Sequence, residues 1–573
     1  MGAAAEAAAA AGGPAAPHAA FVTEAVVAVP ELHGPVRTYV HRAAGVRVVV
    51  CDVPGPLCSA YIVVPTQCSD DRGLPHTLEH LVFCGSRSVP HRGYLDHLAL
   101  RCLTNGTNAW TADDHTAYTA TTAGAVGLYR LLPVFLDHVL HPTLRPTQFT
   151  TEVYHVDGQG REQGVVFAEM NGRENTEGDL LDNAQRQLLY PGTPLAHECG
   201  GRTDAIATLT NDDIQAYHAR FYRPDRVAVF VFGQVDDPQL LDAVAQVDFG
   251  SSPPSTSPAD WPWATPPIAP GTPLAPEARV VPFPSPAEDL ASVSLGWRGP
   301  AFDDLETCLS LEVLLRYLLE TPASPISQRF IERDVPLASS ADYELKLFNP
   351  TSVLITFSGV PIAAPGRADA DDRGEDEDED RSDAGSASGT ETEEEEEGED
   401  EGAADDDDDA SGSGSDGEDD AELVGLTEPG RYKQLLLDLL RELHDTGFPD
   451  GAAVMAPIVR RHRVKYLESL EDDSVDILAG ALIQEVVHGG RGPRDGLPVP
   501  ALAVPLGDRM RRVGATLDRL EHEPMAFWRA LLKRWFLDHA PVEVIMRPDP
   551  DLAARRADEV ARAVAPPLDG LRR

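Results

Sequence analysis

The first half of the chain alternates short apolar runs with segments in which apolar positions recur every three or four residues. Runs rich in β-branched residues predict strands at 36–40, 46–51, 60–64 and 227–232. Helical periodicity predicts helices at 95–102, 125–140 and 209–226. Thr210 with Asp213 three residues later is typical of a helix start, and Pro224 marks its end. This mixture predicts an α+β domain with a mixed sheet and helices packed on one face.

The second half repeats this kind of pattern after a Pro-rich stretch. A strand is predicted at 291–297, and helices at 305–319, 432–443 and 517–537, the last broken near Pro524. Residues 253–276 contain many prolines and two tryptophans, which predicts an extended linker rather than a core element. A chain of 573 residues is too long for one core, so two domains of about 200 residues each are expected.

The charge is strongly acidic and unevenly spread. The chain has 47 basic and 93 acidic residues and a net charge of −46. Between Gly366 and Glu422 stand 29 acids and three arginines, a composition that predicts a disordered insertion. An expanded surface loop is the simplest interpretation, and an acidic interaction segment or a repulsive bristle is the alternative. Because no basic patch and no membrane-length apolar run occurs, nucleic-acid binding and membrane insertion are not expected.

One short motif in the first half carries chemistry. His76, Glu79 and His80 are three and four residues apart, so on a helix they lie on one face and can converge on one point. Two neutral imidazoles suit zinc, and a catalytic zinc needs a third protein ligand and an open position. Buried polar groups of this kind need partners, and a metal would satisfy them together.

Three downstream acids compete to be the third ligand: Glu169, Glu174 and Glu177. A helical pattern begins near Glu169 and runs to Leu188. On one helix Glu169 and Glu177 would lie about 12 Å apart, so they cannot both reach one metal.

His-x-x-Glu-His followed at a distance by a Glu-Met helix resembles the inverted zincins of the pitrilysin and insulinase family. The resemblance implies that His76, His80 and Glu169 bind zinc and that Glu79 is the general base. In that family a second acid stands seven residues before the ligand Glu, and Glu162 holds that place here. It would orient a ligand or modulate the site from behind it.

Further stretches between these motifs strengthen the resemblance. Residues 105–111 and 114–118 resemble the family's edge strand, whose Asn-Ala backbone, here Asn108 and Ala109, pairs with an extended peptide substrate. An ordinary strand after a turn is the alternative for Asn108. The spacing from His80 to Glu169 and the phrase at 172–177 look most like the presequence-protease branch and its uncharacterised eukaryotic relatives.

The resemblance is strong over about 30–240 and weaker over 280–545, which would form a second domain of similar fold without a metal. We therefore predict two related α+β domains, each a mixed or antiparallel sheet with helices on one face. Their boundaries, with the segments around them, are a disordered N-terminus at 1–25, the catalytic domain at 26–248, a Pro-rich linker at 249–277, the second domain at 278–545 with its disordered acidic insertion at 363–422, and the start of a connecting helical segment at 546–573.

The implied function is a zinc-dependent endopeptidase, with one Zn²⁺ per chain, that hydrolyses unstructured peptides inside a chamber. Two-halved members of the family are about twice as long, and their second half supplies an Arg and a Tyr that contact the substrate. No equivalent pair stands here, so activity is expected to need a second half-shell or a dimer partner. The alternatives are a non-catalytic structural subunit of the same fold and an acidic interaction protein that uses 366–422.

The cysteines bear on the compartment. Seven are present, an odd number without Cys-x-x-Cys spacing, which favours a reducing environment. Residues 1–20 contain no Lys or Arg, so they lack the features of a secretory signal or a mitochondrial transit peptide. A cytoplasmic protein is expected, in preference to a mitochondrial one.

Overall fold

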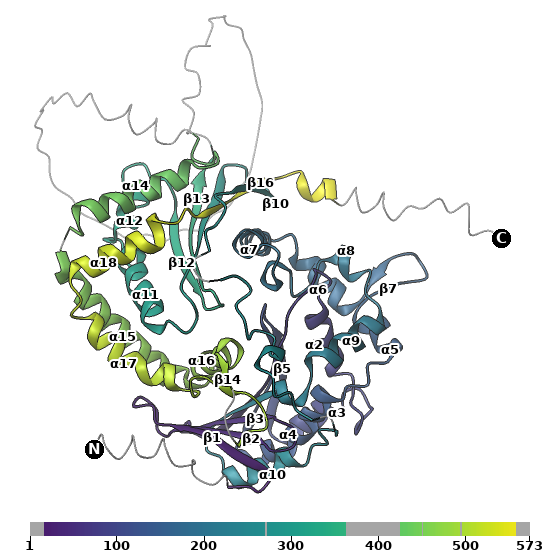
Figure 1. The fold of residues 1–573 in the computed structure, drawn as a ribbon. Coiled ribbons are helices and arrows are strands. Elements are labelled where there is room, and N and C mark those ends of the chain that lie inside the picture. The colour runs from purple at the N-terminus through teal and green to yellow at the C-terminus, as the bar shows by residue number, and fades with distance from the viewer. Residues whose placement is uncertain are drawn as a thin grey trace, which may run out of the picture.

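The computed structural model describes residues 17–251, 253–269, 272–362, 425–449, 451–492 and 496–556. In this part of the chain two domains, each built on one large sheet, form the two arms of an arch (Figure 1). Both sheets are mixed and carry helices, which confirms the predicted α+β class. No helix within these ranges is both long and apolar enough to cross a bilayer.

The sheet of the first domain has seven strands in the order β1-β2-β3-β9-β4-β6-β5. They are β1 (Phe21–Val27), β2 (Val36–His41), β3 (Arg47–Cys51), β4 (Leu57–Pro65), β5 (Thr104–Thr111), β6 (His115–Ala123) and β9 (Ala228–Phe232). The central pair β3 and β9 is parallel and buried on both faces, as its runs of Val and Phe require. All other neighbours are antiparallel. Strand β5 forms one edge of this sheet.

Helices cover one face of this sheet. In chain order the helices of this domain are α2 (Leu74–Val82), α3 (Tyr94–Arg101), α4 (Ala125–Leu140), α5 (Pro146–Glu152), α6 (Val165–Arg173), α7 (Glu177–Leu189), α8 (Thr203–Ile206), α9 (Asn211–Phe221) and α10 (Asp237–Ala245). Helix α7 is an exception, because it packs on the sheet of the second domain. Helix α4 has the bounds that the apolar periodicity predicts, and Thr210 caps α9 together with Asp213 as expected.

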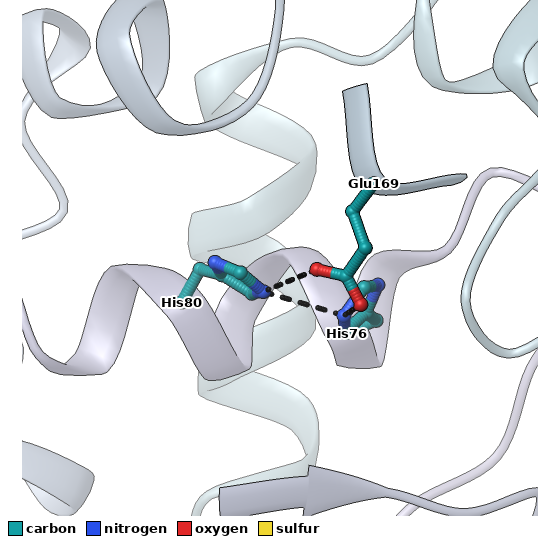
Figure 2. A group of neighbouring side chains, drawn as sticks. All are labelled: His76, His80 and Glu169. Atoms are coloured by element: carbon teal, nitrogen blue, oxygen red, sulfur yellow. Dashed lines mark hydrogen bonds and ion pairs between the residues drawn. The ribbon is translucent and has the colours of Figure 1, made fainter. Parts of the chain in front are cut away.

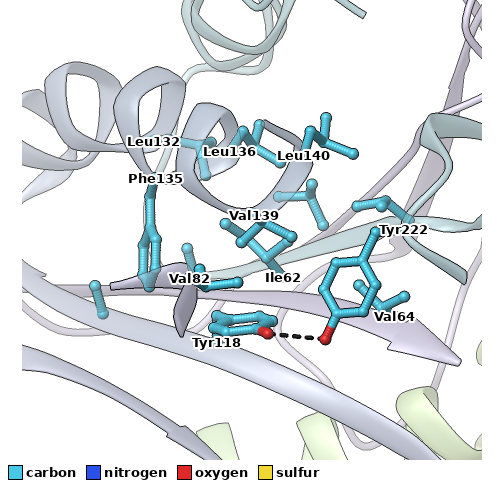
Figure 3. Close-up of a cluster of buried hydrophobic side chains, with 14 of the residues drawn as sticks. Ile62, Val64, Val82, Tyr118, Leu132, Phe135, Leu136, Val139, Leu140 and Tyr222 are labelled. Carbon is cyan, nitrogen blue, oxygen red and sulfur yellow. Dashed lines mark hydrogen bonds between the residues drawn. The ribbon is translucent and has the colours of Figure 1, made fainter. Parts of the chain in front are cut away.

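The core of the first domain lies between α4 and the sheet. Leucines 132, 136 and 140, with Phe135 and Val139, pack on Ile62 and Val64 of β4 (Figure 3). The hydroxyls of Tyr118 and Tyr222 lie 2.8 Å apart within this layer. Each large apolar side chain buried here stabilises the fold by about 1.5–3 kcal/mol, so the layer fixes β4 and β6 firmly beneath the helices.

The second domain repeats the strand arrangement of the first. Its sheet order is β10-β16-β11-β13-β12, with β10 and β16 parallel and all other neighbours antiparallel. The strands are β10 (Ala278–Pro284), β11 (Leu290–Arg298), β12 (Ser340–Lys346), β13 (Ser352–Pro361) and β16 (Val542–Asp549). These five strands match β3, β4, β5, β6 and β9 in order and direction, so the two sheets share one topology.

The helices of the second domain are α11 (Leu305–Leu319), α12 (Pro325–Phe330), α14 (Arg431–Thr446), α15 (Met455–Asp472), α16 (Ser474–His488), α17 (Asp508–Leu520) and α18 (Met525–Leu532). Helix α11 matches its prediction, and Pro524 interrupts the last predicted helix between α17 and α18. Helix α16 leaves the second core and packs on the open face of the first sheet. There Asp476 accepts a hydrogen bond from the hydroxyl of Tyr61 at 2.5 Å.

The predicted linker is a packed element, which corrects the sequence interpretation. Trp261 is 8% and Trp263 is 2% exposed. The indole of Trp263 donates to the carbonyls of Thr66 and Asp114 at 2.9 and 2.8 Å, and that of Trp261 donates to Val487 at 3.1 Å. The prolines of this segment suggested an extended spacer, yet its two indoles fill the seam between the domains.

Two other predictions need correction. Strand β1 begins at Phe21, within the stretch 1–25 predicted to be disordered, because Phe21 is fully buried in the first core. The single helical pattern predicted from Glu169 to Leu188 is two helices, since α6 ends at Arg173 and Thr176 caps α7. The acidic insertion predicted at 363–422 and most of the segment 546–573 lie outside the described residues.

Candidate metal centre

Helix α2 presents the His-x-x-Glu-His motif from a tightly fixed start. Gly73 precedes the helix with φ +67°, and a side chain there would meet the backbone of the loop at Gly200. This close approach brings the Gly200 carbonyl 3.2 Å from Nδ1 of His76. With Nδ1 held in this way, Nε2 of His76 is left to face the site, as is common for metal-binding histidines.

The three side chains expected to bind a metal come together. Nε2 of His76 and Nε2 of His80 lie 3.3 Å apart, and the Glu169 carboxylate reaches them at 3.6 and 3.5 Å (Figure 2). One atom from each residue lies within 4.8 Å of the others. His76 is buried, whereas the Glu169 side chain is 40% exposed, so the group is open on one side.

Of the three competing acids, Glu169 on α6 is the one beside the imidazoles. Glu174 turns away and accepts hydrogen bonds from the Thr203 amide and hydroxyl at 2.9 and 2.6 Å, which caps α8. Glu177 begins the separate helix α7. Among the described residues, the group able to hold a metal comprises His76, His80 and Glu169.

Glu162 is not part of this group. It lies in a short hairpin of β7 (His155–Val156) and β8 (Glu162–Gln163), and its carboxylate accepts a hydrogen bond from Tyr154 at 2.8 Å. A role for Glu162 behind a ligand therefore stays a prediction.

Glu79, on the same helix, is 8% exposed. The hydroxyl of Thr111 donates to its Oε2 at 2.6 Å. Burial raises the pKa of Glu79, the hydrogen bond from Thr111 lowers it in part, and the net shift is upward. A carboxylate with a raised pKa is a stronger proton acceptor, which suits a general base.

Burial also shapes His80. It lowers the pKa of His80 to about 4, with a further contribution from the neighbouring His76. The imidazole is therefore neutral at physiological pH, the state that a metal requires of its ligand. Two imidazole nitrogens and one carboxylate, open on one side, fit the three-ligand set of a catalytic zinc.

The edge strand that is predicted to bind the substrate lies next to this group. Asn108 and Ala109 lie on the edge strand β5. They pair with Thr119 and Tyr118, respectively, of the neighbouring strand β6. A cavity of about 300 Å³ runs between the strand and the motif, and its lining residues are Glu79, His80, Phe83, Asp96, Thr107, Asn108, Ala109 and Glu152. The edge and the candidate base thus face one cavity.

The sequence interpretation missed two features of the site. Thr111 is the last residue of the predicted edge strand. Its role, to donate a hydrogen bond to the Glu79 carboxylate, is evident only from the structure. Asp114, three residues later, is fully buried between His115 and His488, at 2.6 and 2.7 Å. His488 belongs to the second domain and 374 residues separate it from Asp114, so no local pattern could have paired them.

Two comparisons with protein families bear on this geometry. Residues 67–175, which contain the motif, β5 and Glu169, match the Insulinase (Peptidase family M16) domain. Residues 208–349 match the domain described as the Peptidase M16 inactive domain.

Curated relatives point the same way. An uncharacterised Caenorhabditis elegans protein is 36% identical over 337 residues, which are 58% of this chain and 33% of that protein. The mitochondrial presequence protease of Danio rerio is 29% identical over 340 residues, 56% of this chain and 33% of the protease. The match thus spans about one third of the length of these relatives.

Solved structures share the fold. A protease from Helicobacter pylori has a TM-score of 0.60 at 16% identity, covering 90% of this chain and 99% of that one. The first half of the periplasmic protease PqqL from Escherichia coli has a TM-score of 0.56 at 13% identity, covering 96% of both. When the complete PqqL protease is compared, the match covers 50% of its chain. The strand order, the motif helix and these matches agree that residues 67–175 and 208–349 are domains of the insulinase family of peptidases, family M16.

Proposed function

We propose that the chain is a zinc-dependent endopeptidase that hydrolyses unstructured peptides inside a chamber. The observation that carries the proposal is the convergence of His76, His80 and Glu169 beside the buried carboxylate of Glu79. Zinc bound by the three ligands would act as a Lewis acid toward the scissile carbonyl and would lower the pKa of a water molecule.

The residues of this chain supply the proton transfers and the binding. Glu79 takes a proton from the attacking water and passes it to the leaving amine, while Thr111 holds its carboxylate in place. The free edge of β5 at Asn108 and Ala109 binds the peptide as an added strand, through main-chain hydrogen bonds that need little side-chain choice. Glu162 would assist from behind, although its present partner is Tyr154.

Metal content and cleavage test the proposal together. Purified protein should contain about one zinc per chain, and a chelator should remove both the metal and the cleavage of an unstructured fluorogenic peptide. Added zinc should restore both. Zinc-loaded protein that never cleaves such peptides would instead favour the non-catalytic subunit of the same fold.

We also propose that a second half-shell completes the chamber, since the chain resembles half of the PqqL protease in fold. Positioning of the substrate from the opposite side can be worth several kcal/mol in the barrier. Cleavage by the chain alone should therefore be slow, and it should rise when a second half from a longer relative is added. If the chain is shown to be a monomer and is fully active, the proposal that a second half-shell is needed is wrong.

The compartment is a further proposal. All seven cysteines are free, and six of them are buried, which supports a reducing environment such as the cytoplasm. Fractionation of cells that express a tagged chain would test this.

A further inference from the structure

We propose that Arg186 is a positioning residue of the candidate metal centre, because it holds both the loop behind the ligand His76 and the turn behind the base Glu79. The inference rests on the proposed function and adds a residue to the site. Arg186 lies on α7 and is 3% exposed. It is not one of the side chains that can hold a metal, so its effect on zinc must pass through its neighbours.

One side of the guanidinium leads to the ligand His76. Nη2 of Arg186 donates to Oε2 of Glu198 at 2.5 Å, and Oε1 of that carboxylate accepts from the Gly200 amide at 3.0 Å. Nη1 also donates to the carbonyl of His197. The carbonyl of Gly200 in turn lies 3.2 Å from Nδ1 of His76. Arg186 therefore fixes the loop whose carbonyl orients the His76 imidazole.

The other side leads to the base Glu79. Nη1 of Arg186 donates to Oδ1 of Asp113 at 2.9 Å, in the turn that joins β5 to β6. Two residues earlier, Thr111 donates to Oε2 of Glu79 at 2.6 Å. The thiol of Cys199 lies 3.9 Å from the Thr111 carbonyl and joins the loop to the turn. Burial raises the pKa of Asp113 to about 6 and Arg186 opposes this shift, so the charged turn depends on the guanidinium.

The second domain supports Arg186. Nε of Arg186 donates at 2.8 Å to Oδ2 of Asp182, one turn earlier on α7, and the other oxygen of Asp182 accepts from Nζ of Lys346 on β12. Helix α7 itself packs on the second sheet. Burial would lower the pKa of Arg186, but the surrounding carboxylates raise it above its usual range, so the guanidinium stays charged. A domain without a metal-binding group among its described residues thus holds the centre of the other domain in place.

Arg186→Lys tests this role, because Lys keeps the charge and much of the buried stem but has one nitrogen atom. It cannot hold Asp113 and Glu198 as the fork of Arg does. In the full chain we expect zinc affinity, measured by competition with a chromophoric chelator, to fall about tenfold. The matched control is Arg47→Lys, a guanidinium that is 2% exposed and bound to Glu24 on the first sheet. It should leave zinc affinity unchanged.

Two further variants separate the two sides. Glu198→Gln should lower zinc affinity several-fold, and in the Arg186→Lys background it should add little, because the two residues act as one unit. Asp113→Asn should leave zinc affinity unchanged. In zinc-saturated protein it should instead lower kcat several-fold with little change in KM, because it acts through Glu79 and not through peptide binding.

The zinc measurements separate failure of this inference from failure of the proposed function. Wild-type zinc affinity in folded Arg186→Lys and Glu198→Gln proteins overturns the inference, as does an equal loss in Arg47→Lys. If Arg186→Lys does not fold, Glu198→Gln decides alone. Zinc-loaded wild type that cleaves no peptide overturns the proposed function only, since the affinities still test Arg186. A wild-type chain that binds no zinc overturns both.

Discussion

The two domains share one strand order, but among the described residues only the first has a group of side chains that can hold a metal. The two domains differ in the helix that follows the strand, α2 after β4 in the first domain and α11 after β11 in the second. Counted from the first helical residue, α2 has His76, Glu79 and His80 at positions three, six and seven. Helix α11 has Thr307, Ser310 and Leu311 at the same positions. Ser310 and Leu311 are fully buried, and the Ser310 hydroxyl donates to the Glu306 carbonyl within the helix.

This comparison shows what a metal centre demands of a fold. In the second domain Leu311 is part of the apolar core, which stabilises the domain directly. In the first domain Glu79 and His80 are polar groups whose charged forms burial disfavours, since it raises the pKa of Glu79 and lowers that of His80. The first domain gives up local stability at α2 for a group that can bind a metal, whereas the second keeps its core.

The largest effect should come from making α2 more like α11. His80→Leu removes one of three ligand atoms, so zinc affinity should fall by at least about 100-fold and hydrolysis should vanish with it. Unfolding of the metal-free protein should change little, because Leu buries apolar surface in place of the contacts that His80 makes with His76 and Glu169. Calorimetric zinc titration and thermal unfolding measure the two effects.

Its counterpart in the second domain is Leu311→His. This change buries an imidazole in an apolar core and should lower the free energy of unfolding by about 2 kcal/mol or more without adding a zinc site. Zinc binding by this variant at a second site would show that the comparison is wrong.

The next effect separates the base from the ligands. Glu79→Gln should lower kcat by about 100-fold or more while about one zinc per chain remains bound, because Glu79 is proposed to move a proton and not to bind metal. Ser310→Ala, at the same position of α11, is the matched control and should leave kcat unchanged. Loss of zinc from the Glu79 variant would mean that the roles of Glu79 and Glu169 are reversed.

A smaller effect should appear at the seam that joins the two domains. Trp263→Phe leaves the carbonyls of Thr66 and Asp114 without the indole donor, which should lower the free energy of unfolding by about 2 kcal/mol. In Trp528→Phe, on α18, the equally buried indole has no hydrogen-bond acceptor within the described residues. The control therefore loses volume alone, and an equal loss of stability in both variants would assign the effect to packing.

The smallest effect concerns pH. The hydrogen bond from Thr111 lowers the pKa of Glu79, so Thr111→Val should raise that pKa further. A general base must be deprotonated, and hydrolysis is lost as pH falls through its pKa. The acid limb of kcat/KM against pH should therefore move to higher pH in this variant. Thr121→Val, whose hydroxyl pairs with Ser59 on the same sheet, should leave the limb in place.

Local sequence determined the elements and the motif. The bounds of α4 and α11 follow from apolar periodicity, and the Thr210 cap marks the start of α9, because these signals act within one or two helical turns. The spacing of His76, Glu79 and His80 likewise needs only a helix to bring the side chains to one face.

Tertiary structure alone decided which distant groups meet. The choice among Glu169, Glu174 and Glu177 depended on the break between α6 and α7, which turns Glu174 toward Thr203 and leaves Glu169 at the imidazoles. The burial of Trp263 and the pairing of Asp114 with His488 depended on how the second domain packs against the first. Such contacts join residues far apart in the chain, and side-chain periodicity carries no information about them.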